Sequence, residues 1–194
     1  MPKVSDAYRD ARRDEIGHAA MRRLSDQGFA KTTMADIIEE SGLSAGAIYS
    51  HFTSKAEIVH YVARLTVGTK VEELIDHARS SEPPLGPIEV ITFVMEATKQ
   101  AGIRRALLLQ VWAEATVDPE LHAVVDQTVD RLRGAFAGAI EPWLRATGRA
   151  TDASSIRAVV DTMVALAQGF ITNSALFGRD DPTAYLEGAA ELLR

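Results

Sequence analysis

Residues 32–55 read TTMADIIEESGLSAGAIYSHFTSK, and they decide the fold expected for the chain. Thr33 can cap a first short helix, and Asp36 stands at the third helical position, close to the pattern of a capping box. The apolar residues that follow have the i, i+3 and i+4 spacing of an amphipathic helix and are Met34, Ile37 and Ile38. The stretch therefore begins with a helix whose start is encoded by its own side chains.

A second short helix is expected directly after a tight turn. Gly42 stands where the first helix should stop, in the left-handed conformation that glycine adopts without steric cost. Ser44 can cap a helix over residues 45–52, and Leu43 is expected to be buried between the two helices. Two helices joined by a short, glycine-containing turn form a helix-turn-helix, whose second helix enters the major groove of DNA.

The segment from Gly42 to Lys55 also resembles a known family. Its residues, GLSAGAIYSHFTSK, resemble the DNA-binding segment of TetR-type transcriptional repressors, whose pattern is roughly G-[VL]-S-x-G-x-[LI]-Y-x-[HY]-F-x-[SD]-K. Every fixed position of that pattern is filled. The resemblance implies an all-α transcriptional regulator that binds double-stranded DNA as a homodimer, and it rests on the N-terminal part of the chain.

The resemblance also implies which residues contact DNA. The matching positions are Lys31, Thr33, Ser44, Ala45, Gly46, Tyr49, His51 and Lys55. Gly46 lets the helix approach DNA closely, because no Cβ intervenes. Ala45 and Ala47 provide no hydrogen-bonding side chain, so direct base readout is expected to be limited. Ser44, Ser50, contacts to thymine methyl groups and DNA shape are then left to supply specificity.

Composition is that of a soluble globular protein. The chain has 194 residues, of which 46% are hydrophobic and 25% charged, and it contains no cysteine, which excludes disulfides and thiolate metal sites. The N-terminal residues lack the apolar core of a secretory signal, and no run approaches the roughly 18 apolar residues of a membrane span. We therefore expect a cytoplasmic protein with no membrane partner.

Charge is divided unevenly along the chain. The net charge is −6, yet residues 1–55 carry 8 Lys/Arg against 8 Asp/Glu, so all of the net acidity lies in residues 56–194. A neutral DNA-binding part still contacts phosphates locally, but its non-specific affinity is expected to be modest and strongly dependent on salt.

The remaining sequence predicts helices only, because β-branched alternation is absent, and the total is about nine. Besides the two short helices, the expected ranges are 6–27, 55–78, 88–101, 104–117, 119–147, 154–177 and 182–193. Ser54 and Glu57 form a capping box at the start of the long helix 55–78, and Pro142 is expected to kink or end its helix early. We expect a DNA-binding domain over residues 1–54 and a ligand-binding and dimerisation domain over residues 55–194.

Dimerisation is expected through the long C-terminal helices. In the family, the last two long helices of each subunit pair into a four-helix bundle, and the helices over 119–147 and 154–177 carry apolar residues on more than one face. The alternative that these faces form only an intrachain core stays open.

A ligand pocket is expected in the same part of the chain, where aromatic, soft and polar side chains are mixed. The candidates are Phe93, Glu96, Gln110, Trp112, Met163, Phe170 and Asn173. A carboxylate such as that of Glu96 favours a cationic, aromatic ligand. Each of these residues singly also fits an ordinary core or surface position.

No catalytic residue, metal site or cofactor is expected. The five histidines lack metal-ligand spacing, and no GxSxG, P-loop or GxGxxG motif is present. The sequence therefore predicts a repressor that binds a palindromic operator as a homodimer and is released by a small hydrophobic or cationic effector. The alternative is a helix-turn-helix DNA-binding protein with no small-molecule effector.

Overall fold

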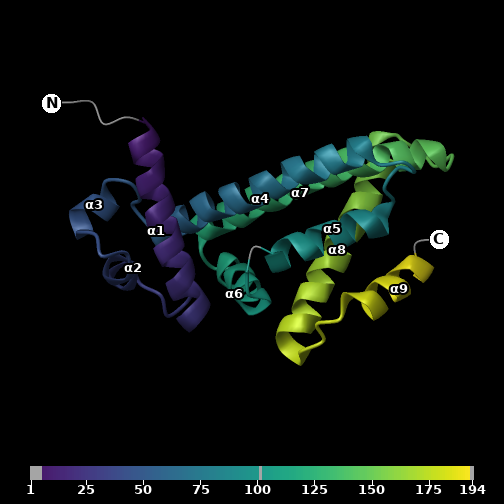
Figure 1. Cartoon of the computed structure of the whole chain (residues 1–194). Coiled ribbons are helices and arrows are strands. Elements are labelled where there is room, and N and C mark those ends of the chain that lie inside the picture. The colour runs from purple at the N-terminus through teal and green to yellow at the C-terminus, as the bar shows by residue number, and fades with distance from the viewer. Residues whose placement is uncertain (1–5, 101, 193–194) are drawn as a thin grey trace. The chain divides into compact units, whose positions relative to one another are not determined.

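The computed structural model describes residues 6–100 and 102–192, and this part of the chain is built from α-helices alone (Figure 1). The helices are α1 (Asp6–Gln27), α2 (Met34–Ser41), α3 (Ala45–Tyr49), α4 (Lys55–Ser80), α5 (Pro87–Gln100), α6 (Arg105–Ala115), α7 (Pro119–Ala146), α8 (Ala153–Phe177) and α9 (Pro182–Leu192). The all-α fold with nine helices within the described residues is as predicted. The expected helix ends at Ala101 and Leu193 lie outside the described residues.

The helix starts follow the side chains that predicted them. Asp152 accepts hydrogen bonds from the N–H groups of residues 154 and 155, each at 3.1 Å, at the start of α8. Asp118 caps α7 through the N–H groups of residues 120 and 121, at 2.9 and 3.1 Å. Asp181 accepts from the N–H of Thr183 at 2.8 Å in α9. Each carboxylate satisfies backbone donors that the first helical turn leaves unpaired.

Several helix boundaries differ by one to three residues from the sequence-based expectation, and so does the effect of Pro142. The recognition helix α3 ends at Tyr49 rather than at residue 52, and α4 continues to Ser80. Pro142 lies inside α7, which runs on to Ala146. The carbonyl that loses its partner belongs to Gly138, which is exposed, so water can satisfy it and the proline does not end the helix.

The chain divides into two compact units. Unit 1 holds the residues up to Leu65 together with Gln110–Val125, and unit 2 holds Thr66–Leu109 together with the residues from Asp126 onward. Helices α4, α6 and α7 each cross from one unit to the other. The domain boundary expected near residue 54 does not coincide with the division into these compact units. As a division between DNA-binding and ligand-binding roles, it stays a prediction.

Unit 1 has a small core formed by α1, α2, α3 and the start of α4. Its buried side chains include Ile16, Ala19, Ala20, Leu24, Phe29, Ile37, Ile48, Phe52 and Ile58. The guanidinium of Arg13 lies over the rings of Phe52 and Tyr61, at 4.5 and 4.7 Å from their centroids. The hydroxyl of Tyr61 donates to Asp14 at 2.8 Å, and burial together with this bond raises the pKa of Tyr61 to about 12. These contacts fasten α1 to α4.

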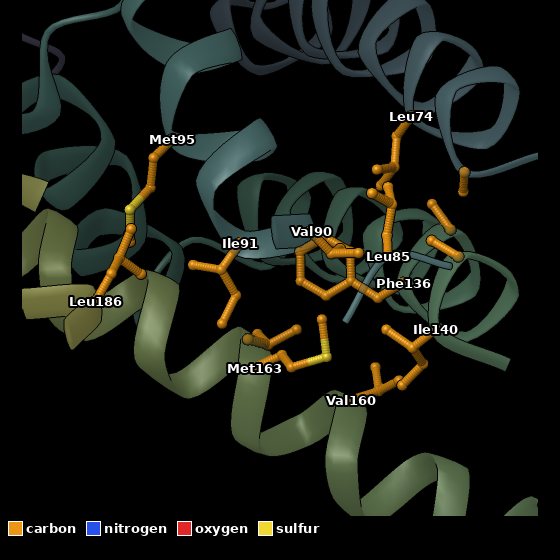
Figure 2. Close-up of a cluster of buried hydrophobic side chains, with 14 of the residues drawn as sticks. Leu74, Leu85, Val90, Ile91, Met95, Phe136, Ile140, Val160, Met163 and Leu186 are labelled. Atoms are coloured by element: carbon orange, nitrogen blue, oxygen red, sulfur yellow. The ribbon is translucent and has the colours of Figure 1, made fainter. Parts of the chain in front are cut away.

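Unit 2 has the larger core, shown in Figure 2, where α5 packs against α8 and α9. The ring of Phe136 from α7, 1% exposed, lies among Leu85, Val90 and Ile140 in the close-up. Met163 of α8 is completely buried beside them. The apolar stripe predicted for residues 154–177 therefore contributes to an intrachain core, and it does so on one face of α8.

Helix α8 is, within the described residues, the one helix whose length and composition alone would allow it to cross a membrane, with a mean hydropathy of 1.2 over its best window. A helix in the core of a soluble protein meets the same criterion. Val160, Met163 and Phe170 of this helix belong to the core of unit 2.

Candidate nucleic-acid interface

The turn between α2 and α3 has the geometry of a helix-turn-helix. Thr33 accepts from the N–H of Asp36 at 3.2 Å and donates its own N–H to the Asp36 carboxylate at 2.7 Å, which completes the predicted capping box. These bonds hold the pKa of Asp36 below its ordinary range. Gly42 has φ 67°, in the left-handed region, and its N–H donates to the carbonyl of Glu39. The turn is therefore built as the sequence predicts.

Helix α3 exposes its N-terminus and buries its opposite side. Ser44 accepts from the N–H of Ala47 at 3.2 Å, while Ile48 is completely buried. Ala45 and Gly46 are exposed, and no atom lies within 4 Å of the Cβ position at Gly46. The N-terminal surface of α3 thus carries only small side chains, which permits close approach of its backbone to a groove.

Two predicted phosphate contacts are exposed near the helix-turn-helix in the sequence. Tyr49 is 51% exposed at the end of α3. Lys31, just before α2, is exposed and forms no ion pair within the described residues. Thr33 is exposed too, but its hydroxyl is occupied by the Asp36 carboxylate at 2.7 Å. Lys31 and Tyr49 are therefore the side chains most ready to meet a phosphate.

A group of arginines near His51 was not identified as functional from the sequence. Burial and the positive charges of Arg13, Arg9 and Arg12 lower the pKa of His51 below its ordinary value. Arg12 already pairs with Glu15 at 2.6 Å, and Arg13 is stacked on aromatic rings. The i, i+3 and i+4 spacing of these arginines on α1 is the signal that places them on one face. This face carries positive charge next to α3.

The other basic residues of α1 are neutralised within unit 1. The Nε of Arg22 lies 2.6 Å from Glu40, and the Nη2 of Arg23 lies 3.4 Å from Glu39. These ion pairs tie α1 to α2, which also contact each other through their backbones. Residues 1–55 have no net charge, but their basic residues are therefore not all alike. The arginines near the C-terminal end of α1 are paired with glutamates, whereas those near its N-terminal end lie close to His51.

Lys55 is turned into the protein. Its Nζ donates to the carbonyls of Phe29 and Thr32 at 2.7 and 2.8 Å, and it lies 3.9 Å from the centroid of the Phe29 ring. Burial lowers its pKa, and the charges of Glu114 and Asp118 act in the opposite direction. A phosphate contact by Lys55 stays a prediction, and it requires the ammonium to leave both carbonyls.

Two of the predicted ligand residues line a groove in unit 2. This α4–α5 groove has a volume of about 470 Å³, and its lining residues are Glu73, His77, Ile88, Glu89, Thr92, Phe93, Glu96, Ala97 and Gln100. His77 stacks on Phe93 with ring centroids 5.7 Å apart. Three carboxylates thus surround an aromatic and aliphatic floor.

The other predicted ligand residues do not line this groove. Met163 and Phe170 are buried in the core, at 0% and 1% exposure, and Asn173 donates to the carbonyl of Gly169 at 2.9 Å. Gln110 and Trp112 belong to the part of α6 in unit 1, where Gln110 accepts from the N–H of Phe29. Five of the seven predicted residues thus do not line this groove, and a pocket that unites the set stays a prediction. Spacing along the chain predicted which helices carry both aromatic and polar residues. It did not predict which face of each helix turns toward a pocket.

The fold and the exposed α3 define the chain as a helix-turn-helix protein. A family model described as "Bacterial regulatory proteins, tetR family" matches residues 16–62. The probable HTH-type transcriptional regulator ArpR of Pseudomonas putida is 38% identical over 112 residues, which are 58% of this chain and 46% of ArpR. TtgR of Pseudomonas putida is 37% identical over 112 residues, which are again 58% of this chain and 46% of the relative. The chain thus spans about half the length of the curated relatives it matches. Residues 16–62 and the curated relatives thus identify the chain as a TetR-family helix-turn-helix transcriptional regulator, from a family that does not consist of enzymes.

Solved structures show the same fold over nearly the whole chain. A putative TetR-family regulator from Syntrophomonas wolfei superposes with a TM-score of 0.76 at 14% identity, covering 94% of this chain and 93% of the other. GusR of Salmonella enterica gives a TM-score of 0.72 at 18% identity, covering 98% and 96%.

Proposed function

We propose that this regulator binds a palindromic operator as a homodimer, acts as a repressor in the cytoplasm, and is released by a small hydrophobic or cationic effector. The observation that carries the DNA-binding part is the exposed, capped N-terminus of α3, together with the exposed Tyr49 at the end of the same helix and the exposed Lys31 before α2. A single helix-turn-helix unit binds weakly, so two copies on two half-sites supply the affinity.

The proposed DNA contacts are of the positioning kind. Lys31, Tyr49 and His51 are placed to meet phosphates, which fix register without reading sequence. Ser44, Ala45 and Gly46 would face the bases, and Thr33 at the start of α2 would make a further contact. Since this surface offers one hydroxyl and a methyl group, thymine methyl contacts and DNA shape contribute much of the specificity.

Selection from a random pool of duplex DNA tests this proposal. We expect enrichment of an inverted repeat whose half-sites are about one helical turn apart. On the selected site, Tyr49→Phe removes one hydroxyl and weakens binding roughly threefold to tenfold, while Tyr8→Phe on α1 leaves it unchanged. A pool with no enriched sequence after selection would show that the chain does not read DNA.

The proposed dimer uses the outer faces of α7 and α8. On α8, Ala158 and Ala165 are exposed, and 28% of its apolar window is buried within the chain. On α7, the Cβ positions of Gly134 and Gly138 have no atom within 4 Å. Such small-residue faces allow close helix pairing, and contiguous exposed apolar surface marks an interface.

Sedimentation measures the dimer directly. The wild-type chain is expected to sediment at twice its chain mass, and Ala165→Glu to shift the equilibrium toward the monomer, because it brings two like charges together across a two-fold axis. Ala184→Glu makes the same change on exposed α9 and serves as the control. A monomeric wild type, or an Ala165→Glu protein as dimeric as the control, contradicts this interface.

The proposed effector site is the α4–α5 groove. It combines the Phe93 ring with the carboxylates of Glu89 and Glu96, for which the described residues supply no ion pair, and it has the size of a small-ligand site. A cation over an aromatic ring and beside carboxylates is held by both. A structural relative from Saccharomonospora viridis, with a TM-score of 0.68 and 18% identity, was solved in complex with choline.

Thermal shift against choline, a hydrophobic amine and a neutral hydrophobic compound separates the two candidate functions. Stabilisation of the wild type by one of them, reduced in Glu96→Gln and kept in Glu72→Gln, supports the effector. Glu72 lies on the same helix as Glu73 but does not line the groove. If no compound stabilises the wild type, the alternative holds, namely a helix-turn-helix regulator without a small-molecule effector.

A further inference from the structure

The segment that leads into the helix-turn-helix is held by two side chains from distant parts of the chain. This segment, Gly28–Thr33, joins α1 to α2 and carries Lys31. Phe29 is 3% exposed. Its N–H donates to Oε1 of Gln110 at 2.9 Å, and its carbonyl accepts from Nζ of Lys55 at 2.7 Å. Both polar groups of one buried backbone unit are therefore satisfied by side chains, one from α6 and one from α4.

Gly28 provides the space in which Gln110 makes this bond. At Gly28 the backbone has φ 84°, which L side chains rarely adopt, and a Cβ there would lie 2.4 Å from Oε1 of Gln110. Any other residue would strain the turn and displace the amide. The close approach of Gln110 is thus built into the turn.

The helix that carries Gln110 is fixed at its other end. Arg105, the first residue of α6, donates to Ser174 at 3.0 Å and to Asp180 at 2.9 Å, all within unit 2. Its guanidinium also lies 4.9 Å from the ring centroid of Phe170. Gln110 follows five positions later, about 7.5 Å along the same helix. The amide that holds Phe29 therefore projects from a helix rather than from a loop.

We propose that Gln110 is a positioning residue of the DNA-binding surface. Through the Phe29 amide it fixes the segment Gly28–Thr33, and with it the phosphate-facing Lys31 and the cap of α2 at Thr33. Gln110 itself contacts no DNA. This inference rests on the proposed DNA-binding function.

Three substitutions at one position test the inference on the selected operator without effector. Gln110→Leu removes the acceptor, and Gln110→Asn keeps the amide but is too short to reach Phe29. Gln110→Glu keeps an acceptor at the same reach. Thr183→Leu introduces a leucine at an exposed position of α9 and serves as the control. Should Gln110→Leu fail to fold, Gln110→Asn carries the comparison.

We expect the leucine and asparagine variants to bind the operator roughly threefold to tenfold more weakly than wild type. Their dependence on salt should be unchanged, because no phosphate contact is lost. Hydrogen exchange at the Phe29 amide should accelerate in both. Gln110→Glu and the control Thr183→Leu should match wild type in affinity and exchange.

Several results would overturn the inference. Operator affinity equal to wild type in both Gln110→Leu and Gln110→Asn would do so. So would an affinity of Gln110→Glu that is as low as that of the other two variants. A loss accompanied by a smaller salt dependence would mean that Gln110 contacts phosphate directly. If the wild type selects no DNA, the proposed function fails first. Unchanged hydrogen exchange at the Phe29 amide in the variants would instead show that Gln110 does not hold this amide, whatever the wild type binds.

Discussion

Replacing Lys55 by methionine tests whether its ammonium serves the fold or the DNA. Methionine keeps most of the side-chain length but cannot donate to the carbonyls of Phe29 and Thr32, which accept at 2.7 and 2.8 Å. Both residues are almost completely buried, at 3% and 1% exposure. The variant therefore leaves two acceptors in a place that water reaches poorly.

The size of the effect follows from these two bonds. A hydrogen bond to a charged group contributes about 1.5–3 kcal/mol, and the cost of burying the ammonium cancels part of the sum. We expect Lys55→Met to lower the free energy of unfolding by about 2 kcal/mol. For a chain of this size, that corresponds to a fall in melting temperature of about 4–8 °C.

Urea unfolding followed by circular dichroism measures the loss, with Lys31→Met as the matched control. Lys31 is exposed, so its replacement should change the free energy of unfolding by less than about 0.5 kcal/mol. An unfolding midpoint for Lys55→Met equal to that of the control would refute the reasoning.

DNA titrations across salt complete the comparison, because each lost phosphate contact reduces the logarithmic salt slope by about 0.9. We expect Lys31→Met to lower the slope and Lys55→Met to keep it. A smaller slope for Lys55→Met would mean that the ammonium leaves its carbonyls when DNA binds.

Three further predictions concern stability. Thr33→Ala removes the cap of α2 and should cost about 1 kcal/mol in urea unfolding; a cost near zero would mean that the cap is dispensable. Phe136→Ala empties the centre of unit 2 and should cost about 3–5 kcal/mol, with calorimetry showing a lower midpoint. The pKa of Asp36 lies below its ordinary value of 3.8, so its bonds stabilise the fold above that pH, and this stability is lost as the pH falls through the lowered pKa. Asp36→Asn should make the stability less dependent on pH below about pH 4, and an unaltered acid-unfolding curve would contradict this.

The fold was largely predictable because its signals are local. The capping box at Thr33, the left-handed Gly42 and the aspartate caps at residues 118, 152 and 181 each depend on neighbours within a few positions. Such signals set where helices begin and end whatever the rest of the chain does. The two-unit organisation depends on which helices pack together, and the sequence gives no local sign that residues 110–125 belong with the N-terminal unit.

The candidate sites were predicted less completely, for a related reason. Ser44, Gly46 and Tyr49 lie on the exposed side of α3 as the resemblance implies. Lys55 has the charge expected of a phosphate ligand, but the carbonyls that occupy it come from a loop 23 and 26 positions earlier. Hydrogen-bond partners that lie so far apart in the sequence produce no spacing pattern from which the contact could be predicted.

The predicted ligand-binding residues also depended on packing that the sequence does not reveal. Phe93 and Glu96 reach the groove, whereas Met163 lies on the face of α8 that turns into the core. Helical periodicity defines the faces of α8 but not which of them meets a neighbour. The rotation of each helix is decided by packing across the whole unit.

The open turn at Gly28 has a consequence for how related sequences vary. A Cβ at this position would fall 2.4 Å from Oε1 of Gln110, although 81 positions separate the partners of the bond at Phe29. Natural variants that replace this glycine should therefore carry a shorter side chain at position 110, and those that keep a long polar side chain there should keep the glycine. Two distant columns of a family alignment are thus expected to change together, with the Phe29 amide as the reason.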